Sequence, residues 1–139
     1  MPWTPPSVGA TATWTRTLTA EDVERYAQIT GDRNLLHFDE GFAARTRFGR
    51  VIVQGGLTAG LFNALVAMEL PGPGSVFLHQ EWDYPAPVFV GDTVTAEAEV
   101  LDARADKPIT KLRCVARNQD GVEVLTGDCL VYTMLPEGR

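Results

Sequence analysis

The sequence has little of the residue types on which metal centres and covalent catalysis depend. It contains two histidines and two serines among its 139 residues. His37 and His79 are far apart and have no neighbouring cluster of ligand residues, so we expect no metal site. Ser7 and Ser75 lack the Gly-x-Ser-x-Gly setting of a serine nucleophile. Metal-dependent hydrolysis and serine catalysis are therefore disfavoured.

Cysteine is equally scarce. Cys114 and Cys129 are the only two, they lack CxxC spacing, and both lie in apolar, strand-like stretches. This setting predicts packed thiols in a reducing compartment rather than a redox or metal motif.

Positive charge is also in short supply. The net charge is −6 and the pI is about 4.8, which argues against nucleic acid or an anionic membrane as partner. A polyanionic ligand would need a local basic patch. There is no targeting segment and no apolar run near the roughly 20 residues of a membrane span, so we expect a cytoplasmic protein. With 45% hydrophobic and 22% charged residues, the chain is expected to form one domain over 1–139.

The first part of the chain predicts one strand followed by short helices. Residues 10–18 alternate in the period-two pattern of a strand. Thr19, with Asp22 three positions later, is typical of the N-cap of a helix over 20–29, which Gly31 is placed to end.

The next segment is expected to be a loop over 32–37, after which Asp39 caps a short helix through 44. The pair Gly55-Gly56 precedes the most apolar helix candidate, residues 57–70. That helix is apolar nearly all round, so we expect it to be buried on most sides.

The second half predicts an antiparallel meander. Four strand candidates cover residues 75–84, 92–104, 109–118 and 122–135, joined by short Pro- and Gly-containing turns. Trp82 and Tyr84 are interpreted as core or dimer-contact residues. The predicted fold class is α+β, a curved antiparallel sheet wrapped around one central apolar helix. The unpaired backbone groups of long edge strands need to be covered. Pairing of two sheets edge to edge in a homodimer would cover them, so we expect a homodimer.

Residues 26–43 carry the most informative pattern, Tyr-Ala-Gln-Ile-Thr-Gly-Asp-Arg-Asn-Leu-Leu-His followed by Phe-Asp-Glu-Gly-Phe-Ala. The pattern resembles the hydratase 2 motif of the MaoC-like (R)-specific enoyl-CoA hydratases, except that Leu35 stands where the motif has Pro. Residues 48–57 are similar to the family's entry into its central helix, although many members carry His in place of Gln54. Residues 87–94 and 106–110 resemble bacterial (R)-hydratases that feed polyhydroxyalkanoate synthesis.

The resemblance implies a single hot-dog domain that adds water to trans-2-enoyl-CoA by syn addition. By this resemblance Asp32 and His37 are the catalytic pair, and both would hydrogen-bond one water molecule. This agrees with the chemistry, because hydration of an enoyl thioester requires a base and an acid. Gly55 is expected to donate its N–H to the thioester oxygen, with Gly56 beside it. The resemblance implies no metal or other cofactor, because coenzyme A is part of the substrate.

Two asparagines are candidate supporting residues. Asn34 is expected to hold the catalytic loop through side-chain hydrogen bonds. Asn63, one of few polar groups on the apolar helix, is either a support near the site or a hydrogen-bonded core amide. His79, on a predicted strand, is interpreted as structural.

The sequence leaves several functions open. The nearest alternative is dehydration of a 3-hydroxyacyl group on acyl carrier protein, because the same side chains perform that chemistry. A thioesterase and a non-catalytic acyl-thioester binding subunit are further alternatives, and the paired Asp32 and His37 speak against both.

Overall fold

One antiparallel sheet and one long helix make up most of the fold. The computed structural model describes residues 3–136. The elements follow in the order β1 (Thr11–Thr17), α1 (Ala20–Thr30), α2 (Leu35–Phe38), α3 (Glu40–Ala44), α4 (Gly55–Met68), β2 (Ser75–Asp83), β3 (Thr93–Ala103), β4 (Ile109–Arg117) and β5 (Glu123–Thr133).

The five strands lie in the order β1-β3-β4-β5-β2, with every neighbouring pair antiparallel. The predicted four-strand meander is confirmed for β3, β4 and β5 only. Strand β2 was expected to lie beside β3 because a short Pro-containing segment joins them, but it pairs with β5 instead, so β1 and β2 are the two edges. The register shifts between Phe77 and His79, Val100 and Asp102, and Ala116 and Arg117. Such irregularities increase the local twist of a strand and so help the sheet to curve.

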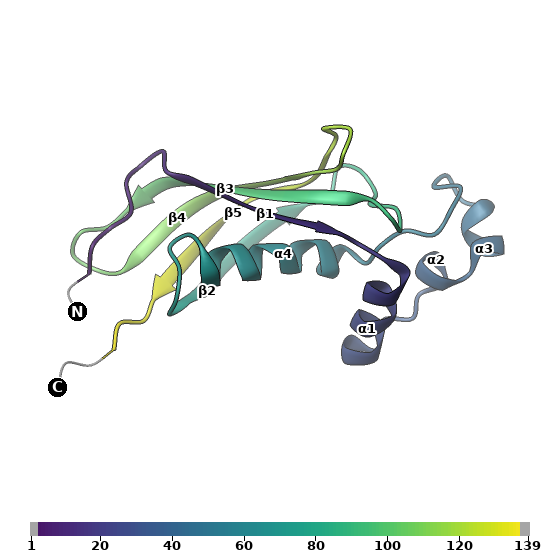
Figure 1. Ribbon diagram of the computed structural model, residues 1–139, viewed down its shortest axis with the longest axis horizontal. Coiled ribbons are helices and arrows are strands. Elements are labelled where there is room, and N and C mark those ends of the chain that lie inside the picture. Colours follow the sequence, from purple (N-terminus) through teal and green to yellow (C-terminus); the bar gives the residue numbers. More distant parts are fainter. Residues whose placement is uncertain (1–2, 137–139) are drawn as a thin grey trace.

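Helix α4 packs along one face of this curved sheet (Figure 1). Leu61, Phe62 and Leu65 point into the core, and the Phe62 ring stacks on that of Trp82 with centroids 5.4 Å apart. Alternate residues of β3 and β4 meet the same core, as period-two burial requires. The predicted α+β class and the assignment of Trp82 to the core are confirmed.

The apolar helix differs from its prediction in two respects. It starts at Gly55 rather than 57 and ends at Met68 rather than 70, so both glycines belong to its first turn. Past its first turn the residues of α4 are buried or half-buried except Asn63 and Met68, which are exposed. The expectation of burial on most sides therefore holds except at these two positions.

Helices α1, α2 and α3 form the end of the molecule opposite the first and last described residues (Figure 1). Thr19 and Asp22 form the predicted capping box, and Gly31 adopts the predicted left-handed conformation with φ 83°. Asp39 caps α3 through the N–H of Phe42 at 2.8 Å, as expected. The end of the predicted 32–37 loop, however, is a helical turn.

The two cysteines lie on adjacent strands in the core. Their Sγ atoms are 3.8 Å apart and form no disulfide. A hydrogen bond to Cys129, together with burial, raises the pKa of the Cys114 thiol. The prediction of packed thiols is confirmed. None of the helices in residues 3–136 is long and apolar enough to cross a membrane.

Candidate active site

His37 is fixed by a hydrogen bond to the segment that leads into α4. The side chain is only 9% exposed, and its Nδ1 lies 2.8 Å from the backbone oxygen of Ile52. A carbonyl can only accept, so Nδ1 must carry a proton. In the neutral imidazole the Nε2 atom is then left with a free lone pair. The fold therefore presents Nε2 as a proton acceptor.

Asp32 is held by a chain of short-range hydrogen bonds that follows α1. Its N–H donates to Thr30 Oγ1 at 3.2 Å, and its Oδ1 accepts the N–H of Asn34 at 3.3 Å. Asn34 in turn caps α2 by accepting the N–H of Leu36 at 3.1 Å. The predicted role of Asn34 in holding this loop agrees with these bonds, which also explain why a helical turn forms here.

The two side chains face each other across a narrow gap. His37 Nε2 and Asp32 Oδ2 are 3.7 Å apart, which is beyond the range of a good direct hydrogen bond. One water molecule can lie within hydrogen-bond distance of both atoms at this separation. Asp32 is 42% exposed, so the gap opens to solvent.

Gly55 and Gly56 form the N-terminus of α4. The N-cap residue, Gln54, makes no side-chain cap, and in the described residues neither glycine N–H donates to an acceptor. These N–H groups lie at the positive end of a 14-residue helix. They can therefore receive a ligand atom that carries negative charge.

Two tyrosines stand against this helix terminus, and the sequence did not single out either as a site residue. A Cβ on Gly55 would lie 3.0 Å from the ring of Tyr84, and one on Gly56 would lie 1.8 Å from the hydroxyl of Tyr26. Burial, with a smaller contribution from Tyr26, raises the pKa of Tyr84. Tyr84 is 49% exposed in the single chain, so it does not belong to the core, and the alternative of a dimer contact stays a prediction. The Pro85-Ala86-Pro87 segment directly after Tyr84 was the sequence feature that could have drawn attention to this part of the site.

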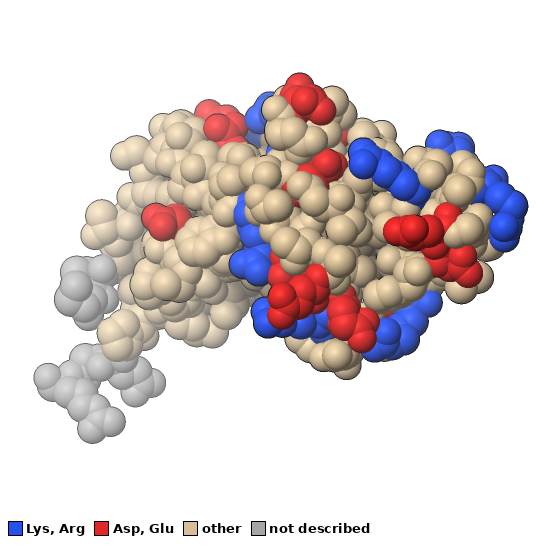
Figure 2. All heavy atoms as spheres, turned by 45° about the vertical axis from the view of Figure 1, so that its right-hand side comes forward, with Lys and Arg blue, Asp and Glu red and all other residues tan. Residues whose placement is uncertain are grey.

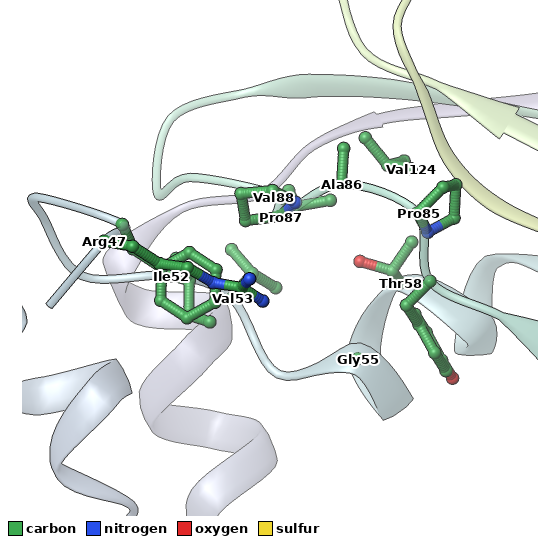
Figure 3. A pocket seen from close by; sticks show the side chains of 12 residues that line it. Arg47, Ile52, Val53, Gly55, Thr58, Pro85, Ala86, Pro87, Val88 and Val124 are labelled. Carbon is green, nitrogen blue, oxygen red and sulfur yellow. The ribbon is translucent and has the colours of Figure 1, made fainter.

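A cavity of about 260 Å³ begins at this helix terminus and is mostly apolar (Figure 3). Its lining includes Gly55, Thr58, Val88 and Val124, with Arg47 at the end away from Thr58. Such a cavity, with few polar groups, suits an apolar ligand. The Thr58 hydroxyl is buried and has no protein partner within residues 3–136.

The segment 50–53 separates this cavity from a second one of about 410 Å³, which His37 lines together with Arg50 and Val90. The structure thus brings Asp32, Asn34 and His37 together. Gly55 and Gly56 follow the segment 50–53, in which the Ile52 carbonyl accepts the hydrogen bond of His37. Of these two cavities, His37 lines one and Gly55 lines the other.

Asn63 and His79 lie outside this arrangement. Asn63 is exposed two turns along α4 and lines neither cavity, so the alternative of a core amide was wrong. His79, on edge strand β2, has its Nε2 3.0 Å from Glu81 on the same strand, which fits its structural interpretation.

The curved antiparallel sheet packed against one long helix defines a hot-dog-fold protein. The model of the protein family described as "MaoC like domain" matches residues 6–121 of the chain. The (R)-specific enoyl-CoA hydratase of Aeromonas caviae is 44% identical over 124 residues, covering 89% of this chain and 92% of that protein. The 3-hydroxybutyryl-CoA dehydratase of Methylorubrum extorquens is 42% identical, covering 89% and 78%.

Solved structures agree with the sequence comparison. The (R)-hydratase from A. caviae involved in PHA biosynthesis superposes with a TM-score of 0.88 at 43% identity, covering 93% of this chain and 98% of that one. The chain belongs to the MaoC-like family, and it is an enzyme of the hydro-lyase class.

Proposed function

We propose that the chain catalyses the reversible (R)-specific hydration of trans-2-enoyl-CoA to (R)-3-hydroxyacyl-CoA. The observation that carries the proposal is the pairing of His37 Nε2 and Asp32 Oδ2 at 3.7 Å, with Nδ1 committed to the Ile52 carbonyl. The named activities of the relatives from A. caviae and M. extorquens support it.

In the proposed mechanism, one water lies between His37 and Asp32. His37 Nε2 takes a proton from this water as its oxygen bonds to C3 of the enoyl group. The C2–C3 π electrons shift towards the thioester, and the negative charge gathers on its oxygen. C2 is then protonated from the same side by the pair, which gives syn addition. The net change is the addition of one water, so the reaction needs no redox cofactor.

The N–H of Gly55 is proposed to donate to the thioester oxygen as that negative charge develops. Within residues 3–136 this N–H has no protein acceptor, and it lies at the start of α4, and both observations support the role. Gly56 follows it, and the Tyr26 hydroxyl occupies the space that a Cβ on Gly56 would take.

The test is an assay with 2-enoyl-CoA thioesters of several chain lengths, with the chirality of the product determined. Formation of (R)-3-hydroxyacyl-CoA supports the proposal. An (S)-product, or no hydration of any thioester, contradicts it.

A second candidate is the reverse reaction on acyl carrier protein. It is favoured by a mitochondrial 3-hydroxyacyl-[acyl-carrier-protein] dehydratase of Solanum lycopersicum, which is 33% identical over 131 residues and covers 93% of this chain and 77% of that protein. Parallel assays with CoA and carrier-protein thioesters separate the two.

We also propose that the enzyme acts as a homodimer with its sites near the interface. Strand β2 is an open edge whose Val76 and Leu78 are exposed, as is Met68 on α4. An edge strand with apolar side chains favours pairing with another strand. Sedimentation that shows a stable and active monomer would overturn this proposal.

A further inference from the structure

Three buried side-chain atoms among residues 3–136 have no hydrogen-bond partner, and they are Gln54 Oε1, Thr58 Oγ1 and Thr110 Oγ1. An unpaired buried polar atom lowers stability, so each one calls for an explanation. Gln54 Nε2 already donates to the Val23 carbonyl at 3.0 Å, and its unpaired oxygen can only accept. Of the three residues, Thr58 alone lines the cavity that begins at Gly55.

The Thr58 hydroxyl is unpaired although helical threonines have a backbone acceptor close by. A threonine in a helix can donate its hydroxyl to the backbone oxygen three or four residues earlier. Thr30 donates in this way to Tyr26 at 2.8 Å, and Thr46 donates to Ala43 at 2.7 Å. Thr58 makes no such bond in the described part of the chain, and Figure 3 shows its oxygen directed toward the middle of the lining side chains. The hydroxyl is therefore available to a ligand.

Thr58 and Gly55 can reach the same ligand atom. Thr58 follows Gly55 by three residues on α4, so both lie on one face of the helix. A helical side chain leans toward the N-terminus, which brings the Thr58 side chain over the first turn. Residues three apart are roughly 5 to 6 Å from each other, and one acceptor can lie about 3 Å from two donors at that separation. One oxygen of a ligand can therefore accept from both groups.

Charged side chains do not take this role. Among the described residues that line the cavity only Arg47 is charged, and it lies at the end away from Thr58 (Figure 3). Figure 2 shows acidic and basic side chains intermingled on the surface at the α1–α3 end of the molecule, which gives no field of one sign. A negative charge that develops at the start of α4 is therefore stabilised by neutral donors in direct contact with it.

We propose that Thr58 is a further catalytic residue, whose hydroxyl donates a second hydrogen bond to the thioester oxygen beside the N–H of Gly55. The inference rests on the proposed function, because this oxygen gains its negative charge only as water adds to the enoyl group. Hydrogen bonds to a charged acceptor are stronger than those to a neutral one. The hydroxyl therefore stabilises the transition state more than the bound substrate.

The test uses three single substitutions in the full chain. Thr58→Val removes the hydroxyl and keeps the shape of the side chain, whereas Thr58→Ser keeps the hydroxyl. Thr110→Val is the matched control, because Thr110 is also buried and unpaired within residues 3–136 but lies on β4 beside the β3–β4 turn, at the other end of the molecule (Figure 1). The quantities measured are kcat and KM for crotonyl-CoA, the pH dependence of kcat/KM and the urea midpoint of unfolding.

We expect Thr58→Val to lower kcat about 10- to 100-fold with little change in KM, because the lost hydrogen bond forms to a developing charge. Its unfolding midpoint should rise, because an unpaired buried hydroxyl has been removed. Thr58→Ser should restore most of the rate. Thr110→Val should show the same gain in stability at the wild-type rate. The pH profile of Thr58→Val should match that of the wild type, because no titrating group has changed.

Butyryl-CoA, a saturated thioester that cannot be hydrated, gives a readout independent of turnover. A hydrogen bond to a carbonyl lowers its infrared stretching frequency, and two lower it further than one. The isotope-labelled carbonyl of bound butyryl-CoA should therefore absorb at a higher frequency in Thr58→Val than in the wild type and Thr110→Val.

A wild-type kcat in Thr58→Val, or an unchanged carbonyl frequency, overturns the proposal. If Thr58→Ser is as slow as Thr58→Val, or if the pH profile shifts, the substitution acts through packing or through the Asp32 and His37 pair, and the proposal fails. In each of these cases hydration by the wild type leaves the hydratase function standing. If the wild type hydrates no thioester, the hydratase function fails, and the carbonyl frequency still decides whether Thr58 donates to the thioester.

Discussion

The hydrogen bond from His37 to the Ile52 carbonyl allows the anchoring and the chemical roles of this histidine to be separated by substitution. The amide nitrogen of an asparagine can take the place of Nδ1, so His37→Asn can keep the bond to Ile52 while removing Nε2. We expect kcat to fall by about 10² to 10⁴, the usual loss when general acid–base catalysis is removed. The free energy of unfolding should fall by less than about 1 kcal/mol, because the bond is retained.

Two further substitutions at the same position provide the comparison. His37→Ala leaves the Ile52 carbonyl without its partner, and an orphaned acceptor costs about 1 to 3 kcal/mol. His37→Gln places an amide near the position of Nε2 but loses the anchor. Both should lower kcat as strongly as His37→Asn does, and His37→Ala should also unfold at a lower urea concentration.

The assay is initial-rate hydration of crotonyl-CoA together with urea unfolding on the same preparations. If His37→Asn is stable and turns over at near the wild-type rate, Nε2 takes no part in catalysis. If it is instead as unstable as His37→Ala, the Nδ1 anchor has been misassigned.

Four other predictions follow from the site and its surroundings. Asp32→Asn should lower kcat by about 10² to 10⁴, and the double variant with His37→Gln should lose little more than the worse single one if both residues hold one water as proposed; additive losses in kcat would show that they act separately. Gly55→Val should lower the kcat of the folded protein by about 10² to 10³ if its N–H serves the oxyanion, besides any loss of stability from the contact of the new side chain with the Tyr84 ring, whereas early melting with normal turnover of the folded protein would remove Gly55 from the mechanism. Gly56→Ala should lower the unfolding midpoint, because its Cβ meets the Tyr26 hydroxyl at 1.8 Å, and Tyr26→Phe should recover part of that loss; no recovery would mean that the hydroxyl is not the obstacle. Asp22→Ala removes the carboxylate whose pKa the hydrogen bond from Arg16 lowers, so it should cost about 1 kcal/mol near neutral pH after allowance for the exposed Arg16, and the cost should vanish as the pH falls through the lowered pKa; urea unfolding of both proteins at pH 7 and at about pH 2.5 checks the sign.

Local signals predicted the elements well where one residue determines the geometry. Gly31 ends α1 because a left-handed residue is needed there, and Thr19 with Asp22 satisfies two free N–H groups at its start. The meander of β3, β4 and β5 followed from alternation and short turns. Edge strand β2 was predicted as a strand, but its pairing with β5 is a long-range contact that no local pattern encodes.

The site was less fully predictable. The motif located Asp32 and His37, yet the 3.7 Å gap and the bond to Ile52 depend on how α1 and the segment before α4 pack together. Tyr26 and Tyr84 were not predicted as site residues because their closeness to the two glycines arises only in the folded chain. The core-amide alternative for Asn63 was wrong because helical spacing gives the face of a residue but not what lies opposite that face.

The first and last described residues lie at the end of the molecule opposite the candidate active site, together with the β3–β4 turn (Figure 1). Trp3 is held there by a hydrogen bond from its indole N–H to the Arg104 carbonyl at 2.7 Å. The described part of the chain therefore begins and ends on the side away from the candidate cavities. This placement suits immobilisation of the protein through that side, with the candidate cavities facing the solution.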